Sequence, residues 1–348
     1  MKLLSICDPT KYKSQPLDVP TFYQRVARDP RVEFYHVPTP QVFTGRRSEV
    51  QAAIAEGDLT YDRFLALGES ARHWIDLQEI DVVFCRTLKP FPAGYLDRLS
   101  QWEKWTRFVN CPSNKKEQMK LDFLLDVAGD YMPESIATAD WRQALTFFEQ
   151  FQTIVAKQGN SCGGRGVFKI WYRDGAFEVD NILVGTRTFA NFADVMTYLQ
   201  AGGSEPIQFC RYLHRTHAGD KRVVVVDGQI YGSYLRRSKS GHWVNNVSSD
   251  GECTLADITD AEIEAIENTV GRYRELGLHT LGYDFLLDND GTWRISEINA
   301  GNIGGFARLE LLTGEPVMDR LIDWLIEYAR RPQLDSGCSI ASPVLGVA

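Results

Sequence analysis

The sequence predicts an α/β protein with an open α/β sheet at its N-terminus, followed by α+β lobes in which helices and strands are mixed. Strand-like and helix-like runs alternate over residues 1–115, which is typical of an open α/β sheet. Later strands flank a glycine-rich turn, and two strand pairs meet at Asp-Gly dipeptides, which favour tight hairpins. We therefore expect three units and a tail, with the boundaries 1–115, 116–205, 206–331 and 332–348.

Length and composition allow several packed lobes and disfavour some classes of protein. The chain has 348 residues, of which 44% are hydrophobic, so it can bury a substantial core. Its net charge of −8 disfavours a broad nucleic-acid-binding surface. Its apolar runs are too short to span a membrane, and its seven cysteines form no C-x-x-C pair that would indicate zinc. We expect a cytoplasmic protein with neither a nucleic acid nor a membrane as its partner.

The N-terminal elements place polar residues at strand ends. The strand LLSIC ends before Asp8, and the apolar strand IDVVFCR, of the kind buried on both faces of a sheet, ends at Arg86. Ligands of open α/β sheets bind beyond the carboxyl ends of the strands, so Arg86 is a candidate binding residue. The other elements expected here are a helix near 22–27, a strand at 32–37, a helix at 94–105 and a strand at 107–112.

The second unit is centred on the glycine-rich turn. A helical stretch carrying Lys120 and a second helix precede the strand TIVAK, which ends at Lys157. The following turn contains Gly163 and Gly164, and glycines let backbone N–H groups close over phosphates without interference from a Cβ atom. The turn is not a P-loop, because the GK[ST] ending is absent and a strand follows. A plain hairpin is the competing interpretation, and the lysine just before the turn favours phosphate binding.

The third unit is expected to contain an arginine-bearing sheet. Its first hairpin turns at the dipeptide Asp227-Gly228, with Arg222 near its start and Arg236-Arg237 at its end. Thr259 and Glu262 form a capping box that begins a long helix. From the end of the second unit onward, the expected elements are a helix at 191–200, a strand at 206–213, a hairpin at 219–237, a polar loop at 238–252, a helix at 261–277, a hairpin at 282–299 and a helix at 315–331.

The hairpin at 282–299 is the strongest candidate for the reactive centre. If Asp290-Gly291 forms a two-residue turn, Asp284 lies directly opposite Glu297, and Asn299 shares the face of Glu297. Like charges directly opposite each other destabilise a sheet, so the arrangement indicates a bound cation. Two carboxylates and an amide oxygen are hard ligands that suit Mg²⁺ carrying a nucleotide phosphate. The competing interpretation is the solvated face of an edge hairpin.

Taken in order, these motifs resemble the ATP-grasp ligases, and most closely the bacterial glutathione synthetase family. The resemblance covers nearly the whole chain, and it rests on the order and spacing of the motifs rather than on any one of them. The matching motifs are Asp8-Pro9, Arg86 with Pro90-Phe91, MKL at 119–121, PES at 133–135, KQGNSCGG at 157–164, GDKRVVVVDG at 219–228, LGYDF at 281–285 and EIN at 297–299. It implies an ATP-grasp fold with an N-terminal open α/β pre-ATP-grasp domain.

The resemblance implies an ATP-dependent carboxylate–amine ligase that forms an amide bond through an acyl phosphate. The substrate carboxylate attacks the γ-phosphate of ATP, and an amine then displaces phosphate, so that most of the catalysis is positioning and charge neutralisation. The implied substrates are a small-molecule carboxylate and a small-molecule amine. The implied cofactors are ATP and Mg²⁺, with two metal ions expected and Mn²⁺ as an alternative. A homo-oligomer is also expected.

The resemblance also implies roles for individual residues. The implied nucleotide-binding residues are Lys120, Lys157, Gly163, Gly164, Cys210, Arg211, Tyr212 and Leu213, with the lysines at the α- and β-phosphates and the strand at the adenine. The implied metal ligands are Asp284, Glu297 and Asn299. The residues implied for catalysis are Arg237, with Arg222 behind it, and Asn246, and those implied for substrate binding are Arg86, Asn302 and Gly304.

The departures from the family pattern lie where the substrates should bind. The segment 300–305, with three glycines, replaces a Ser-Pro-Thr segment, and Leu88-Lys89-Pro90 replaces Asp-Pro-Pro. Val244-Asn245 stands where the family has an arginine. The glycines leave room for a larger acceptor, and Lys89 suits an acidic donor. We therefore expect an acidic or γ-glutamyl acyl donor and an amine that need not be glycine.

Three other functions stay open. One is a ligase that adds an amino acid to a peptide or protein, which would use the same machinery. A second is a small-molecule kinase on the same fold, which would need a general base for its acceptor hydroxyl, and the sequence offers no clear candidate. The third is a nucleotide-binding regulator without turnover, which the complete set of metal ligands and arginines disfavours.

Overall fold

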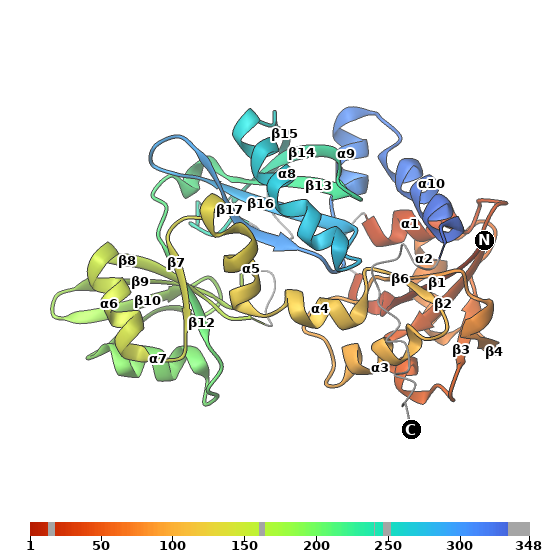
Figure 1. The fold of residues 1–348 in the computed structure, drawn as a ribbon, viewed down its shortest axis with the longest axis horizontal. Coiled ribbons are helices and arrows are strands. Elements are labelled where there is room, and N and C mark those ends of the chain that lie inside the picture. The colour runs from red at the N-terminus through yellow and green to blue at the C-terminus, as the bar shows by residue number, and fades with distance from the viewer. Residues whose placement is uncertain (13–17, 160–163, 240, 246–251, 333–348) are drawn as a thin grey trace, which may run out of the picture.

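Three sheets, one after another along the chain, organise the structure (Figure 1). The structure is a computed structural model, and it describes residues 1–12, 18–159, 164–239, 241–245 and 252–332. Within these residues the sheets contain six, six and five strands. None of the helices in this part of the chain is long and apolar enough to cross a membrane. The predicted mixture of helices and sheets is confirmed.

The first sheet is the open α/β sheet expected over residues 1–115. Its order is β4-β3-β2-β1-β5-β6, with β2, β1, β5 and β6 parallel and the other two strands antiparallel at one edge. Val82 and Val83 belong to cores on opposite faces, as expected for a doubly buried strand. The elements are β1 Lys2–Cys7, α1 Asp18–Val26, β2 Glu33–Pro38, β3 Glu49–Ile54, α2 Tyr61–Ala66, β4 His73–Asp76, β5 Val82–Cys85, α3 Tyr95–Trp102, β6 Arg107–Val109 and α4 Pro112–Gln118.

The second sheet carries the strands on either side of the glycine-rich turn. Its strand order is β11-β10-β9-β8-β12-β7, and every neighbouring pair of strands is antiparallel. Helices α6 and α7 share one apolar core with it, through residues such as Phe148 and Phe192. The elements are α5 Leu121–Ala128, β7 Ser135–Thr138, α6 Trp141–Phe151, β8 Thr153–Lys157, β9 Val167–Arg173, β10 Ala176–Asn181, β11 Gly185–Phe189, α7 Phe192–Gln200 and β12 Ile207–Arg211.

The third sheet holds both predicted hairpins in the order β15-β14-β13-β16-β17. Strand β13 is buried on both faces: Val223 packs in the core with α8, and Val224 packs in the core with α9 and α10. The capping box of Thr259 and Glu262 begins α8, as predicted. The elements are β13 Asp220–Val226, β14 Gln229–Arg237, β15 Glu252–Leu255, α8 Asp260–Glu275, β16 Thr280–Leu287, β17 Trp293–Asn299, α9 Phe306–Thr313 and α10 Val317–Arg330.

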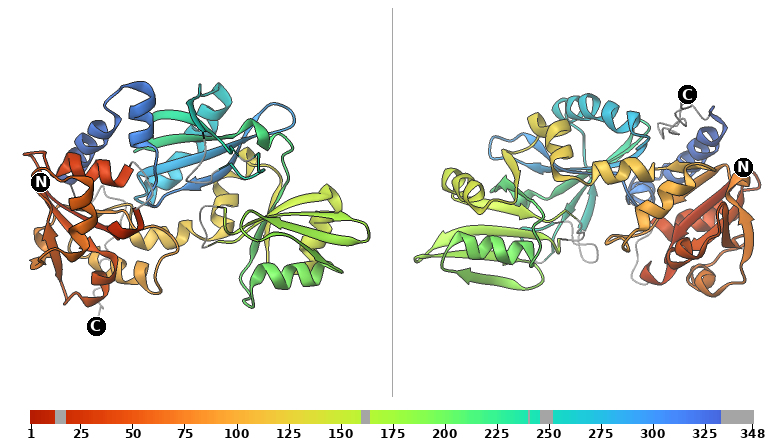
Figure 2. Two further views of the ribbon diagram at one scale, coloured as in Figure 1. Left: turned by 180° about the vertical axis from the view of Figure 1, so that it is seen from behind. Right: turned by 60° about the horizontal axis from the view of Figure 1, so that its bottom comes forward.

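The chain returns to its N-terminal sheet after the last hairpin. Helices α9 and α10 contact α1, and their apolar residues share one core with β1 and β5 (Figure 2). Helix α5, which the sequence places in the second unit, packs against α8 and β17 of the third sheet. Packing therefore crosses the expected boundaries, and the division at residues 115, 205 and 331 stays a prediction.

Candidate active site

A cleft of about 750 Å³ lies between the second and third sheets. Its walls come from β8 and β12 on one side and from β16 and β17 on the other. Six of the residues that the sequence singles out line it: Lys157, Cys210, Arg211, Tyr212, Leu213 and Glu297. The structure thus brings together the phosphate-side lysine, the strand expected at the adenine and one of the expected metal ligands.

The hairpin of β16 and β17 reaches the predicted register by a different route. Its loop contains three residues rather than two, because Asp288 N–H donates to Thr292 O (2.8 Å). A β-bulge at Ser296 then adds one residue to β17, so that Asp284 does pair with Glu297. The expected pair is confirmed, but the expected two-residue turn is wrong. The longer loop shifts the strand register by one residue, and the bulge shifts it back.

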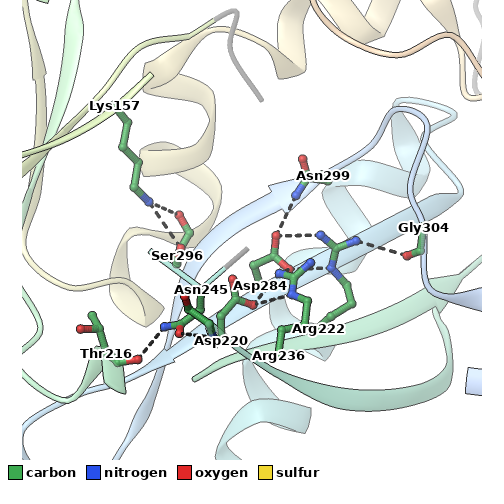
Figure 3. A network of polar contacts seen from close by, with 11 residues as sticks. Lys157, Thr216, Asp220, Arg222, Arg236, Asn245, Asp284, Ser296, Asn299 and Gly304 are labelled. Carbon is green, nitrogen blue, oxygen red and sulfur yellow. Dashed lines mark hydrogen bonds and ion pairs between the residues drawn. The ribbon is translucent and has the colours of Figure 1, made fainter. Parts of the chain in front are cut away.

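The bulge directs the backbone of Ser296 into the cleft. Lys157, at the end of β8, donates from Nζ to Ser296 O at 2.8 Å, which joins the two sheets across the cleft (Figure 3). Bulges commonly re-aim groups beside active sites. The Lys157 ammonium is thus held beside the residues expected to bind the metal, as a phosphate-binding role requires.

Asp284 is buried in a network of ion pairs (Figure 3). Its Oδ1 accepts from Arg222 Nε (2.5 Å) and Arg236 Nη2 (2.7 Å), and its Oδ2 accepts from Arg222 Nη2 (2.9 Å) and Asn299 Nδ2 (3.0 Å). Burial opposes ionisation of Asp284, but the two guanidinium groups outweigh it and lower the pKa. Both carboxylate oxygens are therefore already engaged by the chain.

A second carboxylate completes this network. Arg236 also pairs with Asp220, which lies opposite it in the sheet and lines the cleft. Burial and the nearby Asp284 carboxylate raise the pKa of Asp220 to about 6, although Arg236 acts in the other direction. Two buried carboxylates and two guanidinium groups thus form one cluster beneath the metal-side end of the cleft. Arg236 is the member that pairs with both carboxylates, so its removal would leave Asp220 without an ion-pair partner in the described chain.

The other two expected metal ligands present open oxygen atoms. Glu297 is partly exposed at the cleft, and within the described chain its carboxylate has no hydrogen bond or ion pair. Asn299 uses Nδ2 for its bond to Asp284, which leaves its Oδ1 available. The described residues contain no group of three or more His, Cys, Asp or Glu side chains arranged for a metal. Hard oxygen donors that need further ligands fit Mg²⁺ sharing its sphere with phosphate and water.

The structure turns Arg236 inward, whereas the resemblance assigns the catalytic role to its neighbour Arg237. The hairpin of β13 and β14 has the expected two-residue turn, in which Asp227 and Gly228 both have positive φ (51° and 85°). A bulge near Tyr231 then shifts the register by one residue, which exchanges the two faces of β14. As a result Arg236 meets Asp220 and Asp284, whereas Arg237 is exposed and donates to Ala218 O (3.0 Å).

Other predicted residues lie in different places. Lys120 is exposed, pairs with Glu117 at 2.6 Å and does not line the cleft. Gly164 is buried and has a φ of 77°, a conformation that glycine adopts without strain. Gly163 and Asn246 lie outside the described residues. The structure instead brings Asn245 to the cleft, where its Nδ2 donates to Thr216 O (2.6 Å) (Figure 3).

The strand expected at the adenine is fixed by its side chains. Arg211 binds Asp288 through two N–H groups (3.1 and 2.8 Å) and also pairs with Glu134. Tyr212 packs under the ammonium of Lys169, which lies 4.0 Å from the ring centroid. These contacts tie residues 210–213 to the loop after β16 and to the second sheet, and so fix this wall of the cleft.

The expected substrate residues gather where the segment 300–305 meets the first sheet. Arg86 is 2% exposed and donates from Nη2 to Ile303 O (2.8 Å), while its buried Nε and Nη1 have no partner in the described chain. Asn302 donates to the Arg86 carbonyl (2.8 Å), and Gly304 O accepts from Arg222 Nη1 (3.2 Å). This segment therefore joins the carboxyl end of β5 to the ion-pair cluster.

Comparison with known proteins places these features in a family context. Residues 122–314 match the family model described as "Prokaryotic glutathione synthetase, ATP-grasp domain". The glutathione synthetase of Mesorhizobium japonicum is 26% identical over 284 residues, covering 80% of this chain and 83% of the relative. That of Brucella melitensis is 26% identical over 305 residues, covering 86% and 89%.

Solved structures resemble the chain along almost its whole length. The D-cycloserine synthetase DcsG has a TM-score of 0.63 at 13% identity, with 95% of this chain and 100% of that chain covered. The ATP-grasp ligase PsnB, complexed with a phosphomimetic variant of its minimal precursor, Mg and ADP, has a TM-score of 0.57 at 18% identity, with 94% and 98% covered. At these low sequence identities, the likeness shows a shared fold.

Proposed function

The chain belongs to the prokaryotic glutathione synthetase family of ATP-grasp ligases, and from that premise we propose the substrates and the residue roles of its reaction. It is an ATP-dependent carboxylate–amine ligase, which forms a C–N bond, and its family uses ATP and Mg²⁺. The observation that supports the proposed site is the cleft itself, where Lys157, the Cys210–Leu213 strand and Glu297 face one another. The nucleotide would lie in this cleft.

The nucleotide would be held from both walls. The backbone of residues 210–213 would bind the adenine, and Lys157 would exchange its bond with Ser296 O for one with a phosphate oxygen. Gly163 and Gly164 would close over the phosphates from the turn. Lys120, which is exposed beside Glu117, would reach the phosphates only after a rearrangement of its side chain.

Glu297 and Asn299 would hold Mg²⁺, which supplies charge neutralisation at the phosphates when bound. Asp284 would join them only by giving up a bond to Arg222 or Arg236, and otherwise it keeps the arginines in place. We propose two Mg²⁺ ions, for which Mn²⁺ can substitute. Metal-titrated nucleotide binding with Mg²⁺, Mn²⁺ and Ca²⁺ tests this, and a stoichiometry of one metal ion per nucleotide would exclude the second ion.

The arginines would stabilise the charge that develops on the transferred phosphoryl group. Arg222, beside the Gly304 carbonyl, lies between the metal-side hairpin and the substrate segment. Arg237 and Asn246 are also proposed to act on this group, although Asn246 lies outside the described residues. A preorganised donor of this kind contributes several kcal/mol when it is aimed at the charge of the transition state.

The proposed donor is an acidic or γ-glutamyl amino acid, and the proposed acceptor is an amino-acid amine larger than glycine. Arg86, Asn302 and Gly304 would shape the donor side, where two buried guanidinium nitrogens of Arg86, Nε and Nη1, have no partner among the described residues. An ADP-release screen against pairs of amino acids and dipeptides, including γ-glutamylcysteine with glycine, identifies the pair. A 100-fold preference for glycine with γ-glutamylcysteine, about 2.7 kcal/mol, would contradict the altered acceptor.

A ligase that adds an amino acid to a peptide or protein is the second candidate. The glycines of residues 300–305, in place of a rigid Ser-Pro-Thr segment, are the sequence feature that raises this candidate. The room expected at Gly304 and Gly305 is not there, because added Cβ atoms would lie 3.1 Å from Asp18 Oδ2 and 2.7 Å from Val224 Cγ2, so these two glycines permit close packing instead. ADP release with peptides but not with free amino acids would select it. A homo-oligomeric state and a cytoplasmic location are proposed on the family resemblance, and light scattering tests the first.

Lys157→Ala is expected to weaken ATP binding by roughly 1.5–3 kcal/mol, the range for a lost hydrogen bond to a charged group. The reason is that Lys157 is the ammonium held at the metal side of the cleft. Calorimetry with a non-hydrolysable ATP analogue and Mg²⁺ measures the change. Arg187→Ala, which removes an exposed cation from β11 of the same sheet and not from the cleft lining, is the matched control. Equal nucleotide affinity in Lys157→Ala and the wild type would remove Lys157 from the site.

A further inference from the structure

A buried lysine without a carboxylate partner lies on α4, outside the nucleotide cleft. Lys115 is 5% exposed, and its Nζ donates to Gln118 Oε1. None of the ion pairs in the described chain includes it, whereas Lys116 and Lys120 nearby are exposed and pair with carboxylates. Lysine is almost never fully buried unless it is paired, because an ammonium without a partner is costly away from water. Its remaining N–H groups therefore need an acceptor that the described chain does not supply.

Lys115 lines a pocket whose empty space, together with its open mouth, is about 360 Å³. The pocket lies beyond the carboxyl ends of β5 and β6, where open α/β sheets bind their ligands. Most of its wall is apolar, with Phe91, Leu96 and Leu99 on one side, and Lys115 supplies its cationic group. A ligand of matching chemistry has an apolar body and one anionic end.

The pocket also borders the proposed metal site. Its floor is Ala300, Gly301 and Asn302, which directly follow the Glu297–Asn299 segment. A Cβ atom added to Gly301 would lie 3.9 Å from Lys115 Nζ, so the ammonium packs against the backbone of this segment. Burial and the nearby Lys89 lower the pKa of Lys115, and Glu297 acts in the opposite direction. An anionic group bound beside Lys115 would favour its charged form, next to the residues proposed to bind the metal.

We propose that this pocket binds the amine substrate, with Lys115 holding that substrate's own carboxylate and the apolar wall holding its side chain. The inference rests on the proposed ligase function and adds the class of the acceptor: an amino acid, or a short peptide, with an apolar side chain. The apolar wall does not suit an acidic or γ-glutamyl donor, because such a donor carries further charges. A glycine acceptor would leave this wall without a contact.

The experiment compares acceptors that have or lack the carboxylate. The probes are L-leucine, L-phenylalanine and glycine, together with leucinamide and phenylalaninamide, used with ATP, Mg²⁺ and the donor found in the ADP-release screen. For the wild type we expect KM to be roughly 10- to 100-fold higher for each amide than for its acid, as a lost charged hydrogen bond produces. Lys115→Met is expected to raise KM for the acids by the same factor and to abolish the difference, with KM for ATP unchanged.

A matched control and a second variant keep the result interpretable. Lys116→Met removes an exposed lysine from the same helix and is expected to keep the acid–amide difference. If Lys115→Met fails to fold, Gly301→Val places a branched side chain beside the ammonium and is expected to raise KM for leucine and phenylalanine selectively. Thermal shifts with the same probes and no donor report binding independently of turnover.

The outcomes separate this inference from the ligase proposal. Turnover that prefers neither acids nor apolar side chains, or a preference that survives in Lys115→Met, would overturn the pocket assignment while the ligase function stands. Thermal stabilisation by leucine or phenylalanine that depends on Lys115, without ADP release from any substrate pair, would support the pocket and contradict the proposed reaction. Absence of both turnover with apolar acceptors and thermal stabilisation by them would overturn the acceptor class.

Discussion

Glu297→Gln is expected to reduce kcat/KM by at least roughly 1000-fold, about 4 kcal/mol of transition-state stabilisation, without unfolding the protein. Glu297 faces the cleft, and its carboxylate has no partner within the described chain, so its charge is available to a metal ion. Glutamine keeps the size of the side chain but removes that charge. Steady-state ADP release measures the loss, and metal-dependent protection by nucleotide in thermal melts is expected to shrink with it.

Stability distinguishes this role from a structural one. Glu297 lies opposite Asp284 in the sheet, so removing one of two facing charges is expected to leave the melting temperature of the nucleotide-free protein equal or higher. Glu267→Gln, on the exposed face of α8, is the matched control and is expected to change neither property. Turnover like that of the wild type in Glu297→Gln would remove this residue from the reactive centre.

Arg236→Ala is expected to destabilise the fold by roughly 3–5 kcal/mol, the range for a buried ion pair that loses one partner. Arg236 joins Asp220 to Asp284, and both carboxylates are buried. Without its guanidinium, Asp220 keeps no ion-pair partner in the described chain, and Asp284 keeps only Arg222. Urea unfolding measures the change in the free energy of unfolding.

Two further variants assign the cause. Adding Asp220→Asn to Arg236→Ala is expected to recover part of the lost stability, because it removes the carboxylate that Arg236 neutralised. Arg237→Ala changes the neighbouring exposed arginine and is expected to alter stability by less than about 0.5 kcal/mol. If Arg237 acts on the phosphoryl group, this variant loses turnover at unchanged stability. Equal stabilities of Arg236→Ala and Arg237→Ala would contradict the ion-pair account.

The sequence by itself determined the local elements and the chemistry of the main motifs. Alternating strands and helices predicted the first sheet, the capping box predicted the start of α8, and Asp227-Gly228 predicted its two-residue turn. Lys157 at the end of a strand and Glu297 on a hairpin predicted two residues that the cleft contains. These predictions agree with the structure because each depends on residues within a few positions of one another. Over that distance, secondary-structure propensity and turn chemistry decide the local conformation.

The tertiary structure alone decided which side chains meet. A bulge near Tyr231 turns Arg236 inward in place of Arg237, and one at Ser296 restores the register that the longer loop shifts. Lys115 is buried and lies close to Gly301, which is far away along the chain. Counting along a strand cannot locate a bulge, and each extra residue moves every later side chain to the other face. Burial likewise depends on segments that are distant in the sequence. The partners of Asp284 and the burial of Lys115 are therefore decided only when the sheets pack together.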